Sequence, residues 1–145
     1  MFREHGYTNA HIGKWHTGID AGTGRYWDWQ IVWNRPLHPV NAGPYYDRQL
    51  LSFSGEERMT EGYSTDNYTK WASEFIKGEH RDPSKPWYLW LCYGAIHGPT
   101  TPAARHKGLH KGDEVRVPAD IFPPREGKPD YPNKTPAGAR GHGEG

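Results

Sequence analysis

The chain has 145 residues, enough for one domain with its own core. Its 18 Lys and Arg nearly balance its 17 Asp and Glu, so the charge indicates neither a nucleic-acid-binding protein nor an acidic tail. Hydrophobic residues make up only 34%, although seven Trp and nine Tyr are present beside 18 Gly and 13 Pro. Such a chain either is rich in loops with a core of aromatic rings, or is part of a larger protein.

The single cysteine, Cys92, excludes a disulfide within the chain and a cysteine-based zinc site. No apolar run reaches the length of a membrane span, and the opening residues lack the apolar segment of a signal peptide. The compartment and the oligomeric state therefore stay open.

The first residues predict the last turn of a helix, with Gly6 as its C-terminal cap. A mature domain seldom begins there, so we expect that Met1 is not the true beginning. Residues 7–12 predict a short strand that ends at Gly13. From Gly18 to Gly55, repeated Gly and Pro predict a long ordered loop with short strands.

Residues 64–77 give the clearest helical pattern, with one apolar stripe spaced at three and four residues. Ser64 or Thr65 is the expected N-cap, Asp66 lies favourably near the N-terminal dipole, and Gly78 ends the helix. Residues 87–93 form a continuous apolar run, which predicts a strand buried on both faces, as in a parallel sheet. Helix, turn and buried strand together are typical of an α/β crossover unit.

The remainder of the chain has no periodicity. Residues 115–122 predict at most one short extended segment. The Gly-, Pro- and Lys-rich end predicts loop or disorder over residues 123–145.

The most specific stretch is residues 6–16, which read Gly-Tyr-Thr-Asn-Ala-His-Ile-Gly-Lys-Trp-His. If the last three are extended, Lys14 and His16 point to the same side at the end of a strand. A cation beside an imidazole suits an oxyanion, and ligands of open α/β sheets bind at the carboxyl ends of strands. A generic Lys-x-His is more often a surface lysine beside a structural histidine.

The whole stretch resembles the second signature of sulfatases, in which Gly-Tyr-x-Thr leads through a strand into Gly-Lys-Trp-His. Two weaker stretches follow in the family's order: the helix opened by Thr65-Asp66, and the apolar strand closed by Ala95-Ile96-His97-Gly98-Pro99. The resemblance covers about the first 107 residues, and Val117-Pro118-Ala119 is a weaker match beyond them.

The resemblance implies an α/β protein with a partial alkaline phosphatase-like fold, a fragment of a mostly parallel sheet with flanking helices and long loops. The partial catalytic domain would span residues 1–122. It further implies a sulfuric ester hydrolase, in which Lys14 binds sulfate and His16 orients the hydroxyl of a formylglycine. His97 would donate to the leaving alcohol or to the sulfate.

The departures from the family pattern are as informative as the matches. The family's Cys/Ser-x-Pro-x-Arg motif, whose first residue becomes formylglycine, is missing, and neither Cys92 nor Ser84 fits it. The family binds calcium through an Asp-Asp pair, which this sequence does not contain. Asp66-Asn67 is interpreted as capping the N-terminus of the helix over residues 64–77. We therefore expect no metal ligands, an inactive truncated chain, and exposed strand edges that promote aggregation.

Two other functions stay open. Phosphonate and phosphodiester hydrolases of the same superfamily share much of this pattern, although Gly-Lys-Trp-His favours a sulfatase. A non-catalytic carbohydrate-binding module would stack sugars on aromatic rings, although core packing is the preferred interpretation of those rings (Trp27, Trp29, Trp33, Tyr45 and Tyr46). The expected partner is a sulfated small molecule or sulfated glycan whose identity the sequence does not give. The parent family is commonly periplasmic or extracellular.

Overall fold

The computed structural model describes residues 1–19, 25–35, 47–98, 100–114, 116 and 127. The chain divides into two compact units, Met1–Lys107 and Gly108–Gly145. Predictions for residues 115 and 117–122, for Tyr45 and Tyr46, and for nearly all of the end from residue 123 lie outside the described residues. In the second unit, the described residues 108–112 form turns, and His110 Nδ1 lies 2.7 Å from a carboxylate oxygen of Asp113.

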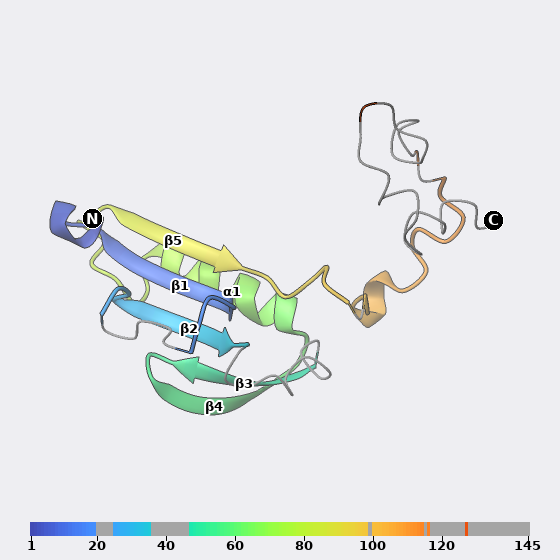
Figure 1. Ribbon diagram of the computed structural model, residues 1–145, viewed down its shortest axis with the longest axis horizontal. Coiled ribbons are helices and arrows are strands. Elements are labelled where there is room, and N and C mark those ends of the chain that lie inside the picture. Colours follow the sequence, from blue (N-terminus) through green and yellow to red (C-terminus); the bar gives the residue numbers. More distant parts are fainter. Residues whose placement is uncertain (20–24, 36–46, 99, 115, 117–126, 128–145) are drawn as a thin grey trace. The chain divides into compact units, whose positions relative to one another are not determined.

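The first unit is a five-stranded mixed sheet with one α-helix among the described residues (Figure 1). The strand order is β4-β3-β2-β1-β5, with β1 at the centre of a parallel trio and with β3 and β4 antiparallel. The elements are the short helix η1 (Arg3–His5), β1 (Thr8–Trp15), β2 (Trp29–Asn34), β3 (Arg48–Phe53), β4 (Glu56–Glu61), α1 (Ser64–Lys77), β5 (Trp87–Cys92) and the short helix η3 (Ala104–His106).

The helix α1 covers one face of the sheet and forms the core there. Its buried Tyr68 and Ala72 pack in one cluster with Ile12, Ile31 and Leu51. Each strand contributes every second residue to this face, as a pleated strand must. The bounds of α1 confirm the predicted helix, and Gly78 ends it in the left-handed conformation with φ of 109°.

The N-terminus of α1 differs from the prediction. Its N-cap residue is Tyr63, and no side chain caps it, so the expected role of Ser64 or Thr65 is wrong. Asp66 is bound instead by both guanidinium nitrogens of Arg105, each at 2.7 Å. The two-pronged guanidinium matches the carboxylate geometry and holds the pKa of Asp66 below its ordinary value.

Two strand predictions need correction. The first strand does not end at Gly13 but continues to Trp15, because Gly13 adopts a φ of 112° while staying in the ladder. The strand β5 is not buried on both faces: Trp87 and Trp90 are exposed. It is an edge strand paired only with β1 among the described strands, whereas β1 lies between β2 and β5 and is buried over residues 9–13.

The strand β4 was not predicted from the sequence. It pairs with β3 through a two-residue turn, Ser54-Gly55, in which both residues have positive φ (48° and 103°). This conformation matches the twist of a hairpin, and a Ser-Gly pair is a recognisable signal for it. Most residues of β4 are charged, so its sequence lacks the alternation of apolar and polar residues that would predict a strand.

The face of the sheet opposite α1 carries an aromatic cluster around His11. This imidazole is fully buried, and its ring centroid lies 5.0–5.4 Å from those of Trp15, Trp27 and Trp90. Within the described part of the chain the ring makes no well-aligned hydrogen bond. Burial therefore lowers the pKa of His11 to about 4, and the backbone of Lys14 opposes the shift only in part.

One buried hydrogen bond links α1 to β3, and its loss should be measurable. Tyr68 donates its hydroxyl proton to Gln49 Oε1 at 2.5 Å, and both side chains are buried. Tyr68→Phe should lower the free energy of unfolding by about 1–3 kcal/mol, because the amide oxygen loses its donor without access to water. Urea denaturation followed by Trp fluorescence measures the change.

The matched control for this variant is Tyr93→Phe. The Tyr93 hydroxyl lies 2.8 Å from Thr69 Oγ1 on the exposed surface, where water replaces the lost partner. The two variants remove the same atom from the same residue type. Equal destabilisation by both would contradict the importance of burial at Tyr68.

No helix in the described residues has the length and apolar content needed to cross a bilayer.

Candidate functional site

Lys14 and His16 lie at the carboxyl end of the central strand. Lys14 is the penultimate residue of β1, and the exposed His16 follows its last residue. The strands β2 and β5 run parallel to β1 on either side, so all three reach the same edge of the sheet (Figure 1). We call this the carboxyl edge.

Gly13 allows β1 and β5 to approach closely just before this edge. A Cβ atom at position 13 would lie 1.9 Å from the carbonyl oxygen of Cys92, its partner in the ladder. Its φ of 112° is also one that side chains disfavour. The glycine that precedes Lys14 is therefore a structural requirement of the edge.

Lys14 is a partly buried cation. Its Nζ lies 5.4 Å from the ring centroid of Trp33 on β2, in cation–π contact with a buried ring. Burial lowers the pKa of Lys14, and the positive charge of Arg35 lowers it further. A partly dehydrated ammonium group gains more from an anion than a fully hydrated one does.

Arg35 is the residue that sequence reasoning missed. It follows the last residue of β2, and its N–H donates to the carbonyl oxygen of Trp15 at 2.8 Å, which extends the parallel ladder. Asn34, just before it, donates from its amide to the carbonyl of Ile19. No motif marks Arg35, and only the pairing of β1 with β2 places it beside the Lys14 strand.

His97 follows the last residue of β5 by five residues. Its N–H donates to the carbonyl oxygen of Gly94 at 3.1 Å, and its Nδ1 lies 2.9 Å from the carbonyl oxygen of Gly98. A carbonyl can only accept, so this contact requires the proton on Nδ1. Proton exchange with a substrate would then run through Nε2. The structure places Lys14 at the end of β1, His16 just after it and the segment of His97 after the end of β5, and the meeting of the three side chains around one anion stays a prediction.

A cavity of about 220 Å³ lies beside this part of β5. Tyr63 at the start of α1 and Ala95 and Ile96 just before His97 line it, together with Thr100–Ala103 and His106. Most of its lining is apolar or neutral, so it suits the uncharged part of a ligand.

Among the residues described at this edge, no set of carboxylates is arranged as a calcium site. Calcium requires several oxygen ligands, commonly carboxylates. Asp66, the candidate by sequence, is engaged by Arg105, and the Asn67 amide donates to the carbonyl oxygen of Glu61 at 2.9 Å. Lys14 and Arg35 make the edge cationic instead.

Cys92 is a strand residue and not an activated nucleophile. It lies within β5, half-buried, and burial raises the pKa of its thiol. A raised pKa lowers the thiolate population on which nucleophilic reactivity depends. The prediction that Cys92 is structural agrees with this placement.

Among the described aromatic residues considered for sugar stacking, Trp33 and Trp29 pack in or against the core. Trp33 is 1% exposed, and Trp29 is stacked between the rings of Phe75 and His80. Trp27 packs on the buried His11. Burial leaves Trp33 no open face for a sugar.

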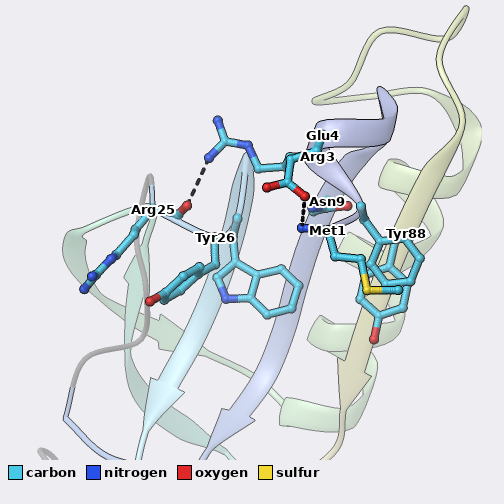
Figure 2. Close-up of a pocket in the computed structure, with 9 residues that line it drawn as sticks. Met1, Arg3, Glu4, Asn9, Arg25, Tyr26 and Tyr88 are labelled. Atoms are coloured by element: carbon cyan, nitrogen blue, oxygen red, sulfur yellow. Dashed lines mark hydrogen bonds and ion pairs between the residues drawn. The ribbon is translucent and has the colours of Figure 1, made fainter.

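A cavity of about 500 Å³ lies near the amino-terminal end of β1, away from the carboxyl edge (Figure 2). Figure 2 shows the Arg3 side chain reaching over this cavity to the carbonyl oxygen of Arg25, at 3.1 Å. Arg3 Nε also pairs with the Asp28 carboxylate at 3.1 Å. These contacts tie the chain before β1 to the chain before β2.

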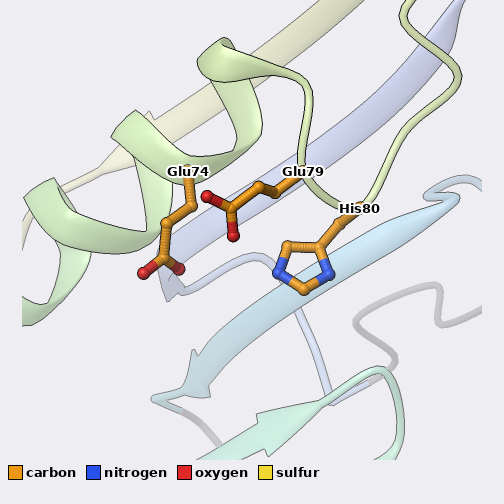
Figure 3. Close-up of side chains that lie close together, drawn as sticks. All are labelled: Glu74, Glu79 and His80. Carbon is orange, nitrogen blue, oxygen red and sulfur yellow. The ribbon is translucent and has the colours of Figure 1, made fainter.

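A second group of titratable residues lies at the C-terminal end of α1 (Figure 3). Ligand atoms of Glu74, Glu79 and His80 lie within 4.8 Å of one another. Glu79 and His80 are exposed, and Glu74 faces Lys70 at 3.9 Å. Because exposed carboxylates commonly gather without an ion, we assign no metal site here.

Comparisons with known proteins agree on one family. The family model described as Sulfatase matches residues 1–134. The N-acetylglucosamine-6-O-sulfatase of Bacteroides thetaiotaomicron is 32% identical over 128 residues, which are 88% of this chain and 21% of that protein. This chain therefore spans about a fifth of the length of that relative.

Solved structures show the same fold. One, a complex with its substrate D-glucosamine-2-N,6-O-disulfate, is 29% identical with a TM-score of 0.64, over 82% of this chain and 22% of the other. Another, Ps i-CgsB in complex with k-i-k-neocarrahexaose, is 20% identical with a TM-score of 0.59, over 79% and 29%. The mixed sheet with α1 is a part of an alkaline phosphatase-like α/β fold. The chain belongs to the sulfatase family.

Proposed function

We propose that this chain forms the sulfate-binding edge of a sulfuric ester hydrolase. The observation that supports the proposal is the parallel pairing of β1 and β5: Lys14 and His16 lie at the end of β1, and the segment that contains His97 follows the end of β5. Lys14 neutralises the sulfate charge. His16 makes a second polar contact, and His97 supplies a proton to the leaving oxygen.

The names of two relatives support a substrate class. The curated relative is named an N-acetylglucosamine-6-O-sulfatase, and the solved complex contains a disulfated glucosamine. We propose that the parent of this edge acts on 6-O-sulfated glucosamine. The isolated chain binds such a sugar without hydrolysing it, because its sequence holds neither the nucleophile motif nor a set of calcium ligands.

Lys14→Met should weaken the binding of glucosamine 6-sulfate by about ten- to a hundred-fold, as expected when an anion loses one charge-assisted contact. Methionine keeps much of the apolar stem beside Trp33 and removes only the charge. Isothermal titration or NMR titration of the 145-residue chain gives the affinity, and sulfate release should stay at background in the same samples.

The matched control is Lys70→Met, which removes an exposed lysine from α1. It should leave the affinity unchanged. Unsulfated glucosamine provides the second comparison. Equal binding of sulfated and unsulfated sugar would reject the sulfate edge and favour a carbohydrate-binding module.

A further inference from the structure

Two cations from neighbouring strands lie at the carboxyl edge. Lys14 pairs with Trp33 in the parallel register of β1 and β2, and Arg35 comes two residues after Trp33. Arg35 is the first residue after β2, so it leaves this pair of parallel strands at the same end as Lys14. The N–H of Arg35 remains in the ladder through Trp15, which fixes where its side chain begins.

The two charges repel each other. Arg35 contributes to the lowered pKa of Lys14, second to burial. No ion pair joins either residue to a carboxylate within the residues that the structure describes. Two cations held together in this way gain stability when anions bind between or beside them.

The two positive charges of Lys14 and Arg35 suggest how many negative charges the ligand carries. A sulfate monoester carries a single negative charge, which Lys14 alone balances. A second fixed cation balances a second anionic group on the same ligand. The guanidinium of arginine is planar and places two N–H groups toward the oxygens of an oxyanion, so Arg35 suits another sulfate group.

We propose that Arg35 binds a second anionic group of the substrate and selects disulfated over monosulfated sugars. This inference rests on the proposed function, because it assumes that Lys14 holds the first sulfate.

The affinity of the chain for glucosamine 6-sulfate and for glucosamine-2-N,6-O-disulfate tests the assignment. The wild-type chain should bind the disulfate about ten-fold more tightly or better, the gain typical of one charge-assisted contact. Arg35→Met should abolish this preference and leave the affinity for the monosulfate within about two-fold. Arg48→Met on β3, where the arginine faces Glu61 at 3.1 Å, is the matched control and should keep the preference.

A second measurement needs no ligand. The Lys14 ammonium titration, followed by NMR, should move to higher pH in Arg35→Met, because the neighbouring positive charge has gone. It should not move in Arg48→Met. Near-UV circular dichroism of the Trp-rich core confirms that each variant is folded before it is titrated.

Each alternative result has a distinct meaning. Loss of both affinities by the same factor in Arg35→Met would overturn the inference and assign Arg35 to the sulfate that Lys14 holds. A wild-type chain that binds both sugars equally would also overturn it and leave the proposed function intact. A wild-type chain that binds neither sugar would reject the proposed function, and the assignment of Arg35 with it.

Discussion

Gly13→Ala should lower the free energy of unfolding by roughly 3–5 kcal/mol, because the added methyl group meets backbone atoms and the backbone is strained. The new Cβ would lie 1.9 Å from the backbone oxygen of Cys92. A backbone atom in a ladder cannot move aside alone, so the pairing of β1 with β5 must open. Because β1 is the centre of the parallel trio, the damage spreads to the whole sheet.

Gly18→Ala separates the clash from the backbone strain. Gly18 has a similar φ of 127°, but nothing lies within 4 Å of the Cβ position. This control should lose only the conformational part, about 1–3 kcal/mol. Urea denaturation of both variants gives the difference. If both variants lost the same free energy of unfolding, the backbones of β1 and β5 would lie farther apart at Gly13 than in the structure.

The sequence predicted those parts of the fold whose local pattern agrees with their environment. The stripe of α1 is apolar because it packs on the sheet, and Gly78 ends the helix because only glycine readily adopts its left-handed conformation. The run from residue 87 identified β5, although its two-sided burial was wrong. An apolar run shows that a strand can be buried, whereas the number of its neighbours decides whether it is.

The strand β4 escaped prediction because tertiary pairing creates it. Five of its six residues are exposed, and its order comes from the ladder with β3 and from the hydrogen bond of Thr60 Oγ1 to the carbonyl of Gln49, at 3.0 Å. Local propensity carries little weight where pairing with a neighbour fixes the backbone.

The candidate site was predicted only as far as its motif extends. Lys14 and His16 lie within one short segment, so their placement on one strand end could be inferred from the letters. Arg35 comes just after another strand, about twenty residues later, and reaches the edge only through the parallel register of β1 and β2. Such a relation is non-local, and a single sequence carries no signal for it.

Acidification should destabilise the fold through His11 well before the carboxylates titrate. The folded-state pKa of this histidine is lowered from the ordinary 6.5 to about 4, because the buried ring cannot hold a charge. The unfolded chain therefore takes up the proton first. Above pH 6.5 this group contributes no penalty; as the pH falls from 6.5 to 4 the penalty grows, and below 4 it is complete. The full shift corresponds to roughly 3 kcal/mol.

His11→Phe isolates this contribution, because phenylalanine keeps an aromatic ring among Trp15, Trp27 and Trp90 and cannot titrate. Its urea midpoint should fall less steeply than that of the wild type between pH 6.5 and 4. His5→Phe, at an exposed position before β1, should follow the wild-type curve. Parallel curves for the wild type and His11→Phe would mean that the ring of His11 reaches water in the folded protein. The aromatic cluster on the face opposite α1 would then be open, and the dry environment that lowers the pKa of His11 would not exist.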